Sequence, residues 1–308
     1  MTVRALVVGS LVMDLAFRVP HRPVPDELVV ASEFGAFRGG RGYNQAVALA
    51  RLGAEVTMVG AVGSDAYGDG FLFSLEREGI DAGRVVQMRG TATGVAVPLI
   101  TPDGRVAYVQ YPGANRYLAP AHCAELPDCD VLMVQGEISA ATSLYAAKVI
   151  AGRGGIILLR PTPAEAIDPE LVDAASLLAP NQAEAATILD HEGEADELAR
   201  ELVTPTRAAV VTMGPRGAAW AAPDGEGKAP TSGIVTAPTV ETVDRTASTA
   251  SFNAALAIAL VEGQSYEEAT RQACAAGAYT ATVRGAEPSL PTRAQVDELL
   301  ERQTRETQ

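Results

Sequence analysis

Short apolar runs alternate with stretches of helical periodicity along most of the chain. Buried strands are predicted where such a run ends at a turn: Ala5–Val8, Val56–Val62, Val131–Val134, Ile156–Leu159, Ser176–Ala179, Ala208–Thr212 and Ala218–Ala221. Helices are predicted where apolar residues recur every three or four positions: Gln45–Leu52, Asp69–Glu78, Ala141–Ala151, Ser251–Val261, Tyr266–Thr282 and Arg293–Arg302. Strands that alternate with helices indicate an α/β domain with a mostly parallel sheet.

Two stretches break this pattern. Glu27–Phe37 and Val95–Tyr111 alternate polar and apolar residues around turns such as Pro102-Asp103-Gly104. This alternation is typical of antiparallel strands with one buried face. We interpret the two stretches as a small sheet that stands off the main domain as a lid. Because a sheet of so few strands is marginal alone, we expect it to pack on the body or on a second copy of the chain.

Composition and charge narrow the function classes. The chain has 308 residues, of which 47% are hydrophobic and 20% charged, an ordinary balance for a globular protein. A net charge of −14 argues against sequence-independent binding of nucleic acid, which needs a basic surface. No apolar run reaches the roughly 20 residues of a membrane span, and no signal peptide is evident. The sparse cysteines fit a reducing compartment, and free thiols are favoured over a Cys123–Cys129 disulfide. We expect a cytoplasmic protein.

A glycine-rich segment precedes the first predicted helix. It reads RGGRGYN over residues 38–44. Glycines let the backbone approach a ligand closely, and the amide of Asn44 can both donate and accept hydrogen bonds. Such a segment is often only structural, but its length and its asparagine favour a site for a polar ligand.

The segment from Gly39 to Phe71 resembles the first signature of the PfkB carbohydrate kinases, and the ribokinase branch in particular. Further stretches resemble family motifs in the family's order: Gly9–Asp14 an opening sugar-binding strand, Gly113–Asn115 a lid-return segment, Gln135–Glu137 a sugar-facing strand end, Asn181–Glu184 the NxxE element that helps hold Mg²⁺ and phosphate, Thr212–Gly217 a nucleotide-binding turn, and Gly285–Ser289 a loop for a monovalent cation. Together these motifs cover nearly the whole chain, which makes the resemblance far more specific than one glycine motif.

The resemblance implies a ribokinase-like three-layer α/β fold over residues 1–308, with a mostly parallel central sheet. It implies a small β-sheet lid contributed by about residues 14–38 and 95–113, and a homodimer formed through the lids. The implied activity is transfer of the γ-phosphoryl group of ATP to a hydroxyl of a sugar or nucleoside, with Mg²⁺ and a monovalent cation such as K⁺.

The resemblance also implies site residues. Those for substrate are Asp14, Gly39, Gly40, Arg41, Asn44, Asn115 and Glu137. Those for nucleotide are Asn181, Glu184, Thr212, Gly214, Gly217 and Thr249, and those for cations are Glu184, Asp244, Thr246 and Ser289. Plainer alternatives stay open: Asp14 as a turn residue, Glu137 as a solvated strand end, and the Asn181–Glu184 element as a helix cap.

The second signature of the family is altered in this chain. The family pattern reads roughly Asp-Thr-Thr-Gly/Ala-Ala-Gly-Asp-Ser/Thr-Phe, whereas residues 244–252 read DRTASTASF. In this register Ala250 stands at the position of the catalytic aspartate, and Thr249 at that of the glycine whose amide approaches phosphate. Arg245 and Ser248 differ as well. Four changed positions favour natural divergence over an engineered knockout.

The altered signature removes the implied general base, since an alanine cannot accept the proton of an attacking hydroxyl. A positioned general base contributes about 10²–10⁴-fold to the rate. We therefore predict a sugar- or nucleoside-binding protein that is a poor or inactive kinase. Two alternatives remain open. A repurposed enzyme would need another acid or base, for which Arg245, Tyr43 and Arg41 are the candidates, and a working kinase would use water or a remote carboxylate.

Overall fold

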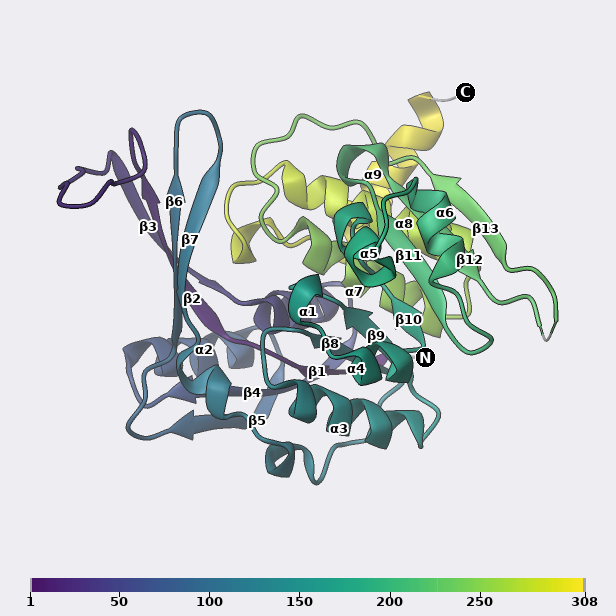
Figure 1. Ribbon diagram of the computed structural model, residues 1–308, viewed down its shortest axis with the longest axis horizontal. Coiled ribbons are helices and arrows are strands. Elements are labelled where there is room, and N and C mark those ends of the chain that lie inside the picture. The colour runs from purple at the N-terminus through teal and green to yellow at the C-terminus, as the bar shows by residue number, and fades with distance from the viewer. Residues whose placement is uncertain (1, 226, 307–308) are drawn as a thin grey trace.

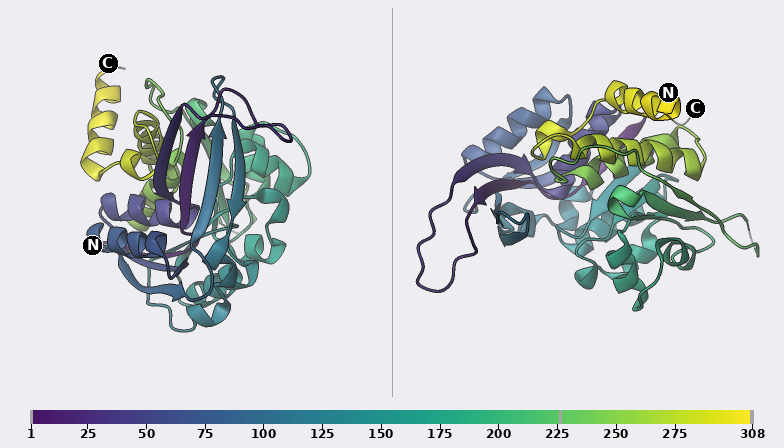
Figure 2. Two further views of the ribbon diagram at one scale, coloured as in Figure 1. Left: turned by 90° about the vertical axis from the view of Figure 1, so that its left-hand side faces the viewer. Right: turned by 90° about the horizontal axis from the view of Figure 1, so that it is seen from above.

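The computed structural model describes residues 2–225 and 227–306, which form three layers (Figures 1 and 2). The middle layer of the described residues is a nine-stranded sheet. In spatial order its strands are β13 (Thr231–Val235), β12 (Ala218–Ala222), β11 (Ala208–Thr212), β10 (Leu177–Leu178), β9 (Ile156–Arg160), β8 (Val131–Gln135), β1 (Arg4–Val8), β4 (Glu55–Gly63) and β5 (Asp81–Met88). Neighbours from β11 to β5 run parallel, and β12 and β13 add an antiparallel edge. The predicted α/β architecture is confirmed.

Helices cover both faces of the sheet, and each face has its own hydrophobic core. The helices of the first core are α1 (Arg41–Arg51), α2 (Ala66–Arg77), α7 (Ser248–Val261), α8 (Tyr266–Ala281) and α9 (Arg293–Glu306). Those of the second are α3 (Ala140–Ala151), α4 (Pro169–Ala174), α5 (Gln182–Leu189) and α6 (Ala195–Glu201). Because successive strand residues point to opposite faces, Val7 enters the first core and Leu6 the second. The central strands are therefore apolar throughout.

A second sheet of four strands stands off this body as a lid (Figure 2). Its strands in spatial order are β3 (Glu33–Gly39), β2 (Val12–Arg18), β6 (Gly94–Ile100) and β7 (Val106–Tyr111). The middle pair is parallel and the outer pairs are antiparallel. The lid thus includes β2 beside the two alternating stretches, and residues 27–32 form no strand.

Helices α1 and α7 begin earlier than their periodicity predicted. Gly40, before α1, has φ 91°, and a Cβ there would lie 2.8 Å from the carbonyl oxygen of Ser10. Residues 38–39 of the glycine-rich segment therefore end β3, and residues 41–44 form the first turn of α1. Ala247, before α7, has φ 64°, in the left-handed region that glycine favours. The start of each of these two helices is therefore set by a special backbone conformation and not by an apolar residue.

Other elements were not predicted because they lack a clear hydrophobic pattern. Helices α4, α5 and α6 have six, eight and seven residues, too few for a helical period to be evident. Strands β5 and β13 are largely half-buried or exposed. The three cysteines are free thiols, and the described helices include none long and apolar enough to cross a membrane.

Candidate functional site

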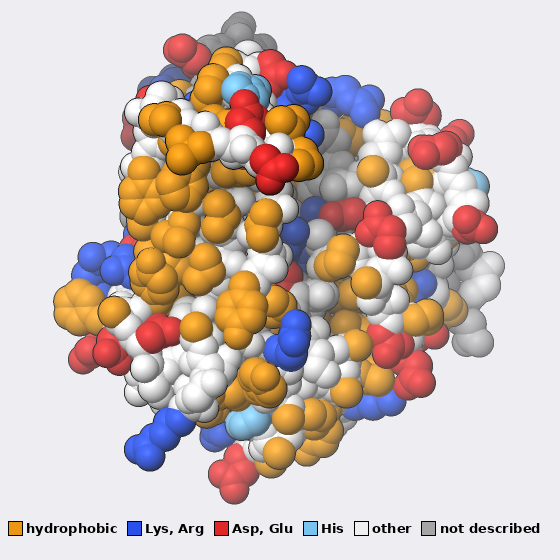
Figure 3. All heavy atoms as spheres, turned by 60° about the vertical axis from the view of Figure 1, so that its left-hand side comes forward, with side chains coloured by type: hydrophobic (Ala, Val, Ile, Leu, Met, Phe, Trp, Pro, Cys, Tyr) orange, Lys and Arg blue, Asp and Glu red, His pale blue; other side chains and the backbone are white. Residues whose placement is uncertain are grey.

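The predicted site residues gather at the carboxyl ends of the central strands and at the base of the lid (Figure 1). Glu137 follows β8, Arg160 ends β9, and Asn181 follows β10. Ligands of open parallel sheets bind outside these strand ends. Figure 3 shows a groove here, between the lid and the body, with charged side chains along it.

The groove has two ends that differ in the elements from which they are built. The lid end comprises Ser10, Asp14, Gly39, Arg41, Asn44 and Glu137. The α7 end comprises residues 244–250, together with Arg160, Asn181, Glu184 and Thr212; its parts meet because α7 packs against β9, which ends in Arg160.

Glu137 is the polar centre of the lid end. Its carboxylate accepts hydrogen bonds from the backbone N–H of Arg41 at 3.0 Å and from Arg41 Nε at 2.9 Å. The hydroxyl of Ser10 donates to the same carboxylate. The structure thus brings two predicted residues into one ion pair. Ser10 was not among the predicted site residues, although its position two residues after the end of β1 is a signal for it.

Asp14 points from β2 toward the strand that carries Gly39. A Cβ at Gly39 would collide with Asp14 Oδ2, so glycine leaves the space that the carboxylate occupies. Burial, with a smaller contribution from Glu137, raises the pKa of Asp14 to about 7. Asp14 therefore gains and loses a proton near neutral pH, as a general acid or base must.

The two predicted asparagines have different surroundings. Asn44 Oδ1 is buried and has no hydrogen-bond partner within the described part of the chain, which is unusual for a buried polar atom and fits a ligand contact. Asn115 is 1% exposed; it accepts from the Leu11 N–H at 3.0 Å and donates to the Leu11 and Pro112 carbonyls at 2.8 and 3.0 Å. Both amide hydrogens of Asn115 are used. The structure gives it a role at the base of the lid and not the predicted substrate contact.

Tyr43 does not reach the groove. It is 0% exposed, its hydroxyl lies 2.8 Å from Ser74 Oγ, and its ring packs edge-on against Phe71. Burial raises the pKa of the Tyr43 hydroxyl above its ordinary value. The prediction of Tyr43 as an acid or base of the pocket is wrong, because position 43 lies on the core face of α1.

The first turn of α7 contains no acidic residue, and Ala250 within it is 7% exposed. The acidic residue of the altered signature is Asp244, which accepts from the N–H and hydroxyl of Thr246 at 2.9 and 2.7 Å and from the Gly285 N–H at 3.0 Å. Burial raises the pKa of Asp244, but these hydrogen bonds outweigh it and the net pKa is lowered. Asp244 therefore fastens two loops and is a weak proton acceptor.

The two arginine candidates cannot replace the missing base. Arg245 is exposed, and its side chain makes no hydrogen bond or ion pair within residues 2–225 and 227–306. Arg41 is paired with Glu137. An arginine side chain stays protonated in proteins, so each of them can stabilise negative charge but cannot accept a proton.

Tyr108, on β7, lies on the same face of the lid as Asp14. Burial raises the pKa of its hydroxyl, and the carboxylates of Asp14 and Asp244 add to this while Arg41 opposes it. Tyr108 is 69% exposed, so these charges act on its hydroxyl from a distance. Tyr108 was not predicted, and the alternation of β7 is the signal that places it on the same face as Asp14.

Asn181 and Glu184 form a reciprocal cap of α5. Asn181 Oδ1 accepts from the Glu184 N–H at 2.8 Å, and a carboxylate oxygen of Glu184 accepts from the Asn181 N–H at 2.7 Å. Asn181 also bridges to Thr212, so the turn of residues 212–217 lies beside this cap. In that turn Gly214 and Gly217 have φ 61° and 104°. The structure brings the predicted nucleotide residues of these two segments together.

Glu184 does not fit the Mg²⁺ that the resemblance implies. Arg160, which is 6% exposed, donates from Nη2 to Glu184 Oε1 at 2.9 Å and pairs through Nη1 with Oε2. The Thr162 hydroxyl donates to Oε1 at 2.6 Å. Both oxygens are thus occupied by donors, and a guanidinium stands where the cation would bind. The described residues contain no group of three or more His, Cys, Asp or Glu side chains able to hold a metal ion.

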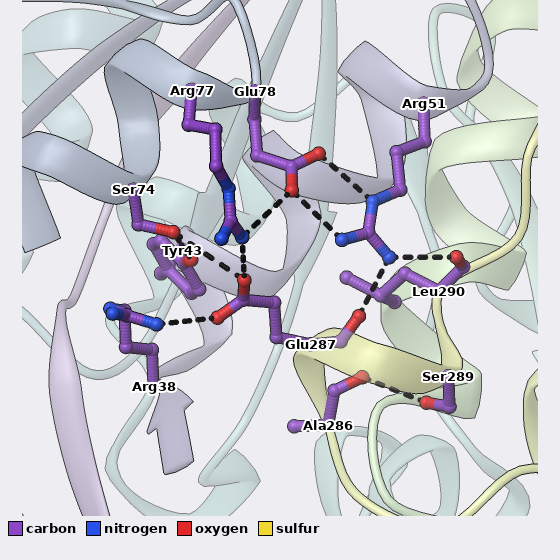
Figure 4. Close-up of polar contacts among 10 residues, drawn as sticks. All are labelled: Arg38, Tyr43, Arg51, Ser74, Arg77, Glu78, Ala286, Glu287, Ser289 and Leu290. Carbon is purple, nitrogen blue, oxygen red and sulfur yellow. Dashed lines mark hydrogen bonds and ion pairs between the residues drawn. The ribbon is translucent and has the colours of Figure 1, made fainter.

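The segments assigned to a monovalent cation lie together, because Asp244 accepts from Gly285. The loop that comes after Gly285 is tied to the helices of the first core through the ionic cluster of Figure 4. Glu287 accepts from Arg77 at 2.8 Å and from Arg38 at 3.2 Å, and Arg51 donates to its backbone carbonyl at 2.7 Å. The side chain of Ser289, 0% exposed, donates to the Ala286 carbonyl. These side chains hold the loop in shape.

Two hollows lie away from the groove. One, of ≈ 610 Å³, is at the opposite edge of the central sheet and is lined by residues such as Arg4, Cys129 and Arg153. The other, of ≈ 480 Å³, lies on the lid beside His21 and Asp103. Neither contains a predicted site residue. The groove is therefore identified by the chemistry that converges on it and not by the size of a cavity.

Known proteins resemble the chain over nearly its full length. The model of the pfkB family carbohydrate kinases matches residues 3–293. The ribokinase of Bacillus subtilis (strain 168) is 34% identical over 298 residues, which cover 96% of this chain and 98% of that protein. The structure of Arabidopsis thaliana ribokinase complexed with ribose and ATP has a TM-score of 0.85 and 28% identity, covering 98% of this chain and 99% of that one. The structure of Burkholderia thailandensis nucleoside kinase in complex with inosine shares the fold. It has a TM-score of 0.83 and 22% identity, covering 97% of this chain and 96% of that one.

Proposed function

Because the chain belongs to the pfkB family of carbohydrate kinases, we propose that it binds a sugar or nucleoside in the groove beneath the lid and phosphorylates it poorly or not at all. The observation that carries this proposal is Ala250: the first turn of α7 offers no carboxylate to take the proton of an attacking hydroxyl. Asp244, six positions earlier, is committed to Thr246 and Gly285.

The lid end supports binding of a polyhydroxylated ligand. Asp14 and Glu137 are carboxylates, Arg41 is a charged donor, and Asn44 Oδ1 is an unpaired acceptor among the described residues. Sugar hydroxyls donate and accept, so they match such a set. The Arabidopsis relative is described with ribose, which makes ribose the first ligand to test. Nucleosides carry the same sugar and remain within the proposal.

The α7 end supports binding of a nucleotide, the ATP of the Arabidopsis complex being the model. The N-terminus of α7 lies at this end, and helix N-termini favour phosphate. A monovalent cation, K⁺ in the family, is proposed between residues 244–246 and 285–289. Thr249 replaces the glycine of the family pattern and brings a branched side chain to the surface that would receive the phosphate.

A second candidate function is a working kinase whose base is Asp14. One observation favours it: the pKa of about 7 suits a carboxyl group that exchanges a proton at neutral pH. Asp14 lies at the lid end, where the sugar hydroxyls are proposed to bind. The repurposed enzyme has no such support, since Tyr43 is buried and the remaining candidates are arginines.

The lid offers a surface for a homodimer, which we include in the proposal. Phe34, Val109 and Tyr111 are 62%, 67% and 51% exposed on the lid. Figure 3 shows hydrophobic side chains gathered on the lid face turned to the viewer. A contiguous exposed apolar patch marks an interaction site. Sedimentation of wild type and of a Phe34→Glu/Val109→Glu variant tests this: a wild-type monomer contradicts it.

The free cysteines fit the cytoplasm as the compartment.

The kinase test compares three proteins. ADP release from ATP, with Mg²⁺ and K⁺ present, is measured against ribose, deoxyribose, hexoses and nucleosides. The proteins are wild type, Thr249→Gly/Ala250→Asp, and the matched control Thr249→Gly/Ala250→Asn, which adds a side chain of the same shape without a base. Calorimetric titration with the same sugars measures binding separately.

We expect wild type to bind a sugar without appreciable turnover, and only the aspartate variant to turn over. Wild-type turnover at an ordinary rate of about 1–10³ s⁻¹ contradicts the proposal. If that turnover disappears in Asp14→Asn while sugar binding persists, Asp14 is the base. If no sugar binds, the binding half of the proposal is wrong.

A further inference from the structure

Arg160 is a buried cation that the resemblance to the family did not predict. It ends β9, directly beside Gln135 in the register of β8. Its Nη1 donates to the Ala179 carbonyl at 2.8 Å, and both terminal nitrogens pair with Glu184. Its Nε is buried and has no partner within the described residues. One N–H of the guanidinium is therefore left for something that the described chain itself does not supply.

Glu184 is saturated by its neighbours. Four donors converge on its two oxygens: Nη1 and Nη2 of Arg160, the Thr162 hydroxyl and the Asn181 N–H. The guanidinium neutralises the carboxylate, so no net negative charge remains to attract a divalent cation. A divalent cation at Glu184 would also have to displace these donors and would meet the positive charge of Arg160. Hard cations such as Mg²⁺ need free oxygen ligands, and Glu184 has none to offer.

Arg160 lies at the carboxyl end of β9, at the α7 end of the groove. Burial lowers the pKa of its guanidinium to about 10, and Arg41 acts in the same direction while Glu184 opposes both. At a pKa of about 10 the group is charged at neutral pH. A charged guanidinium with an unused N–H is a good donor to a phosphate oxygen.

We propose that Arg160 takes the place of a divalent cation at Glu184 and turns its free Nε edge to the phosphates of a nucleotide, so that this chain binds ADP without Mg²⁺. The inference rests on the nucleotide half of the proposed function. It agrees with weak phosphoryl transfer, because a fixed single charge gives less stabilisation to a moving phosphoryl group than a divalent ion that bridges the phosphates. The alternative is an ion pair that serves the fold alone.

The test is a calorimetric titration with ADP, once with EDTA and once with excess Mg²⁺. Wild type should bind ADP in EDTA, and Mg²⁺ should not tighten binding, because it removes negative charge from the ligand and finds no free carboxylate. Arg160→Ala should bind about tenfold or more weakly in EDTA, having lost a charged hydrogen bond, and Mg²⁺ should restore part of this, because Glu184 is now free.

Two further variants protect the test from a folding artefact. Arg160→Met/Glu184→Gln removes both charges and leaves no unpaired ion; it should bind ADP weakly with or without Mg²⁺. Arg153→Ala, at the opposite edge of the sheet, removes an arginine that donates to the Leu126 carbonyl and should bind as wild type does. The thermal unfolding transition of each variant is measured, and binding is compared only below it.

The outcomes separate the two proposals. If wild type needs Mg²⁺ to bind ADP, this inference is wrong while nucleotide binding stands. If ADP binds wild type and both Arg160 variants equally, the ion pair serves the fold alone and the inference is wrong. If ADP binds in neither condition, the nucleotide half of the proposed function fails together with this inference, whereas sugar binding is judged by its own titration.

Discussion

At the lid end of the groove, the position before the helix needs an unusual backbone conformation and is a glycine. At the α7 end, the position before the helix also has such a conformation but is an alanine. Gly40 takes φ 91° with no room for a Cβ, and Gly39 leaves space for Asp14. Ala247 takes φ 64° without the freedom of glycine. Both helices therefore begin after a residue with positive φ, but only at the lid end is that residue a glycine, which suits this conformation.

The charged groups differ in the same way. At the lid end the Arg41–Glu137 pair is partly exposed to the groove, so it can exchange partners with a ligand. At the α7 end the Arg160–Glu184 pair is almost fully buried. The first turn of α7 has no carboxylate in place of the aspartate that the family pattern has at position 250. The comparison leads us to propose that recognition of a ligand and transfer of a phosphoryl group are carried by separable parts of one groove.

The largest expected effect is on catalysis at the α7 end. Thr249→Gly/Ala250→Asp should raise kcat/KM for the preferred sugar by about 10²–10⁴-fold over wild type, the range of a positioned general base. The measurement is ADP release at saturating ATP. An equal gain in the Thr249→Gly/Ala250→Asn control would show that shape and not proton transfer was missing, and would remove the distinction between the two ends.

The next effect is on stability at Arg160. Arg160→Ala leaves Glu184 buried without its partner and should lower the free energy of unfolding by about 3–5 kcal/mol. Arg160→Met/Glu184→Gln removes the pair together and should change it far less. Urea unfolding of the three proteins checks this. Equal losses in both variants would mean that packing of the side chain, and not its charge, stabilises this end.

The pH dependence of stability tests Asp14. Its pKa is about 7 in the folded protein against 3.8 for the free group, so the folded state favours the protonated form. The contribution of Asp14 to the free energy of unfolding is fully present below about pH 4. It is lost as the pH rises through about 7, by up to about 4 kcal/mol. Asp14→Asn should remove this part of the decline. Parallel curves of unfolding free energy against pH for both proteins would contradict a buried carboxyl at the lid end.

The smallest effect is that of Ala247→Gly. A residue other than glycine in the left-handed region costs roughly 1–2 kcal/mol, so the change should stabilise the protein by about 1 kcal/mol. The matched variant, Gly40→Ala, should destabilise it by more than that, because the added Cβ meets the backbone of Ser10 and Val12. Midpoints of urea unfolding measure both. A loss of stability in Ala247→Gly would contradict the strain assigned to this position.

The sequence predicted the fold because the central strands and the longer helices carry strong hydrophobic patterns. Runs such as Val131–Val134 point to buried strands, and their alternation with helices points to a mostly parallel sheet. Helices such as α6 and edge strands such as β13 bury too little apolar surface to show a pattern. They were found only in the structure.

The sequence by itself also determined which chemistry is present and which is missing: Asp14, the 38–44 segment and Glu137 are there, and position 250 holds no carboxylate. Only the tertiary structure decided how these groups are used. Tyr43 and Asn115 turned out to be buried, because the face of α1 and the base of the lid are set by packing between distant segments. The pairing of Arg160 with Glu184, 24 positions apart, depends on the register of neighbouring parallel strands. No local pattern carries that register, since it forms only when the sheet assembles.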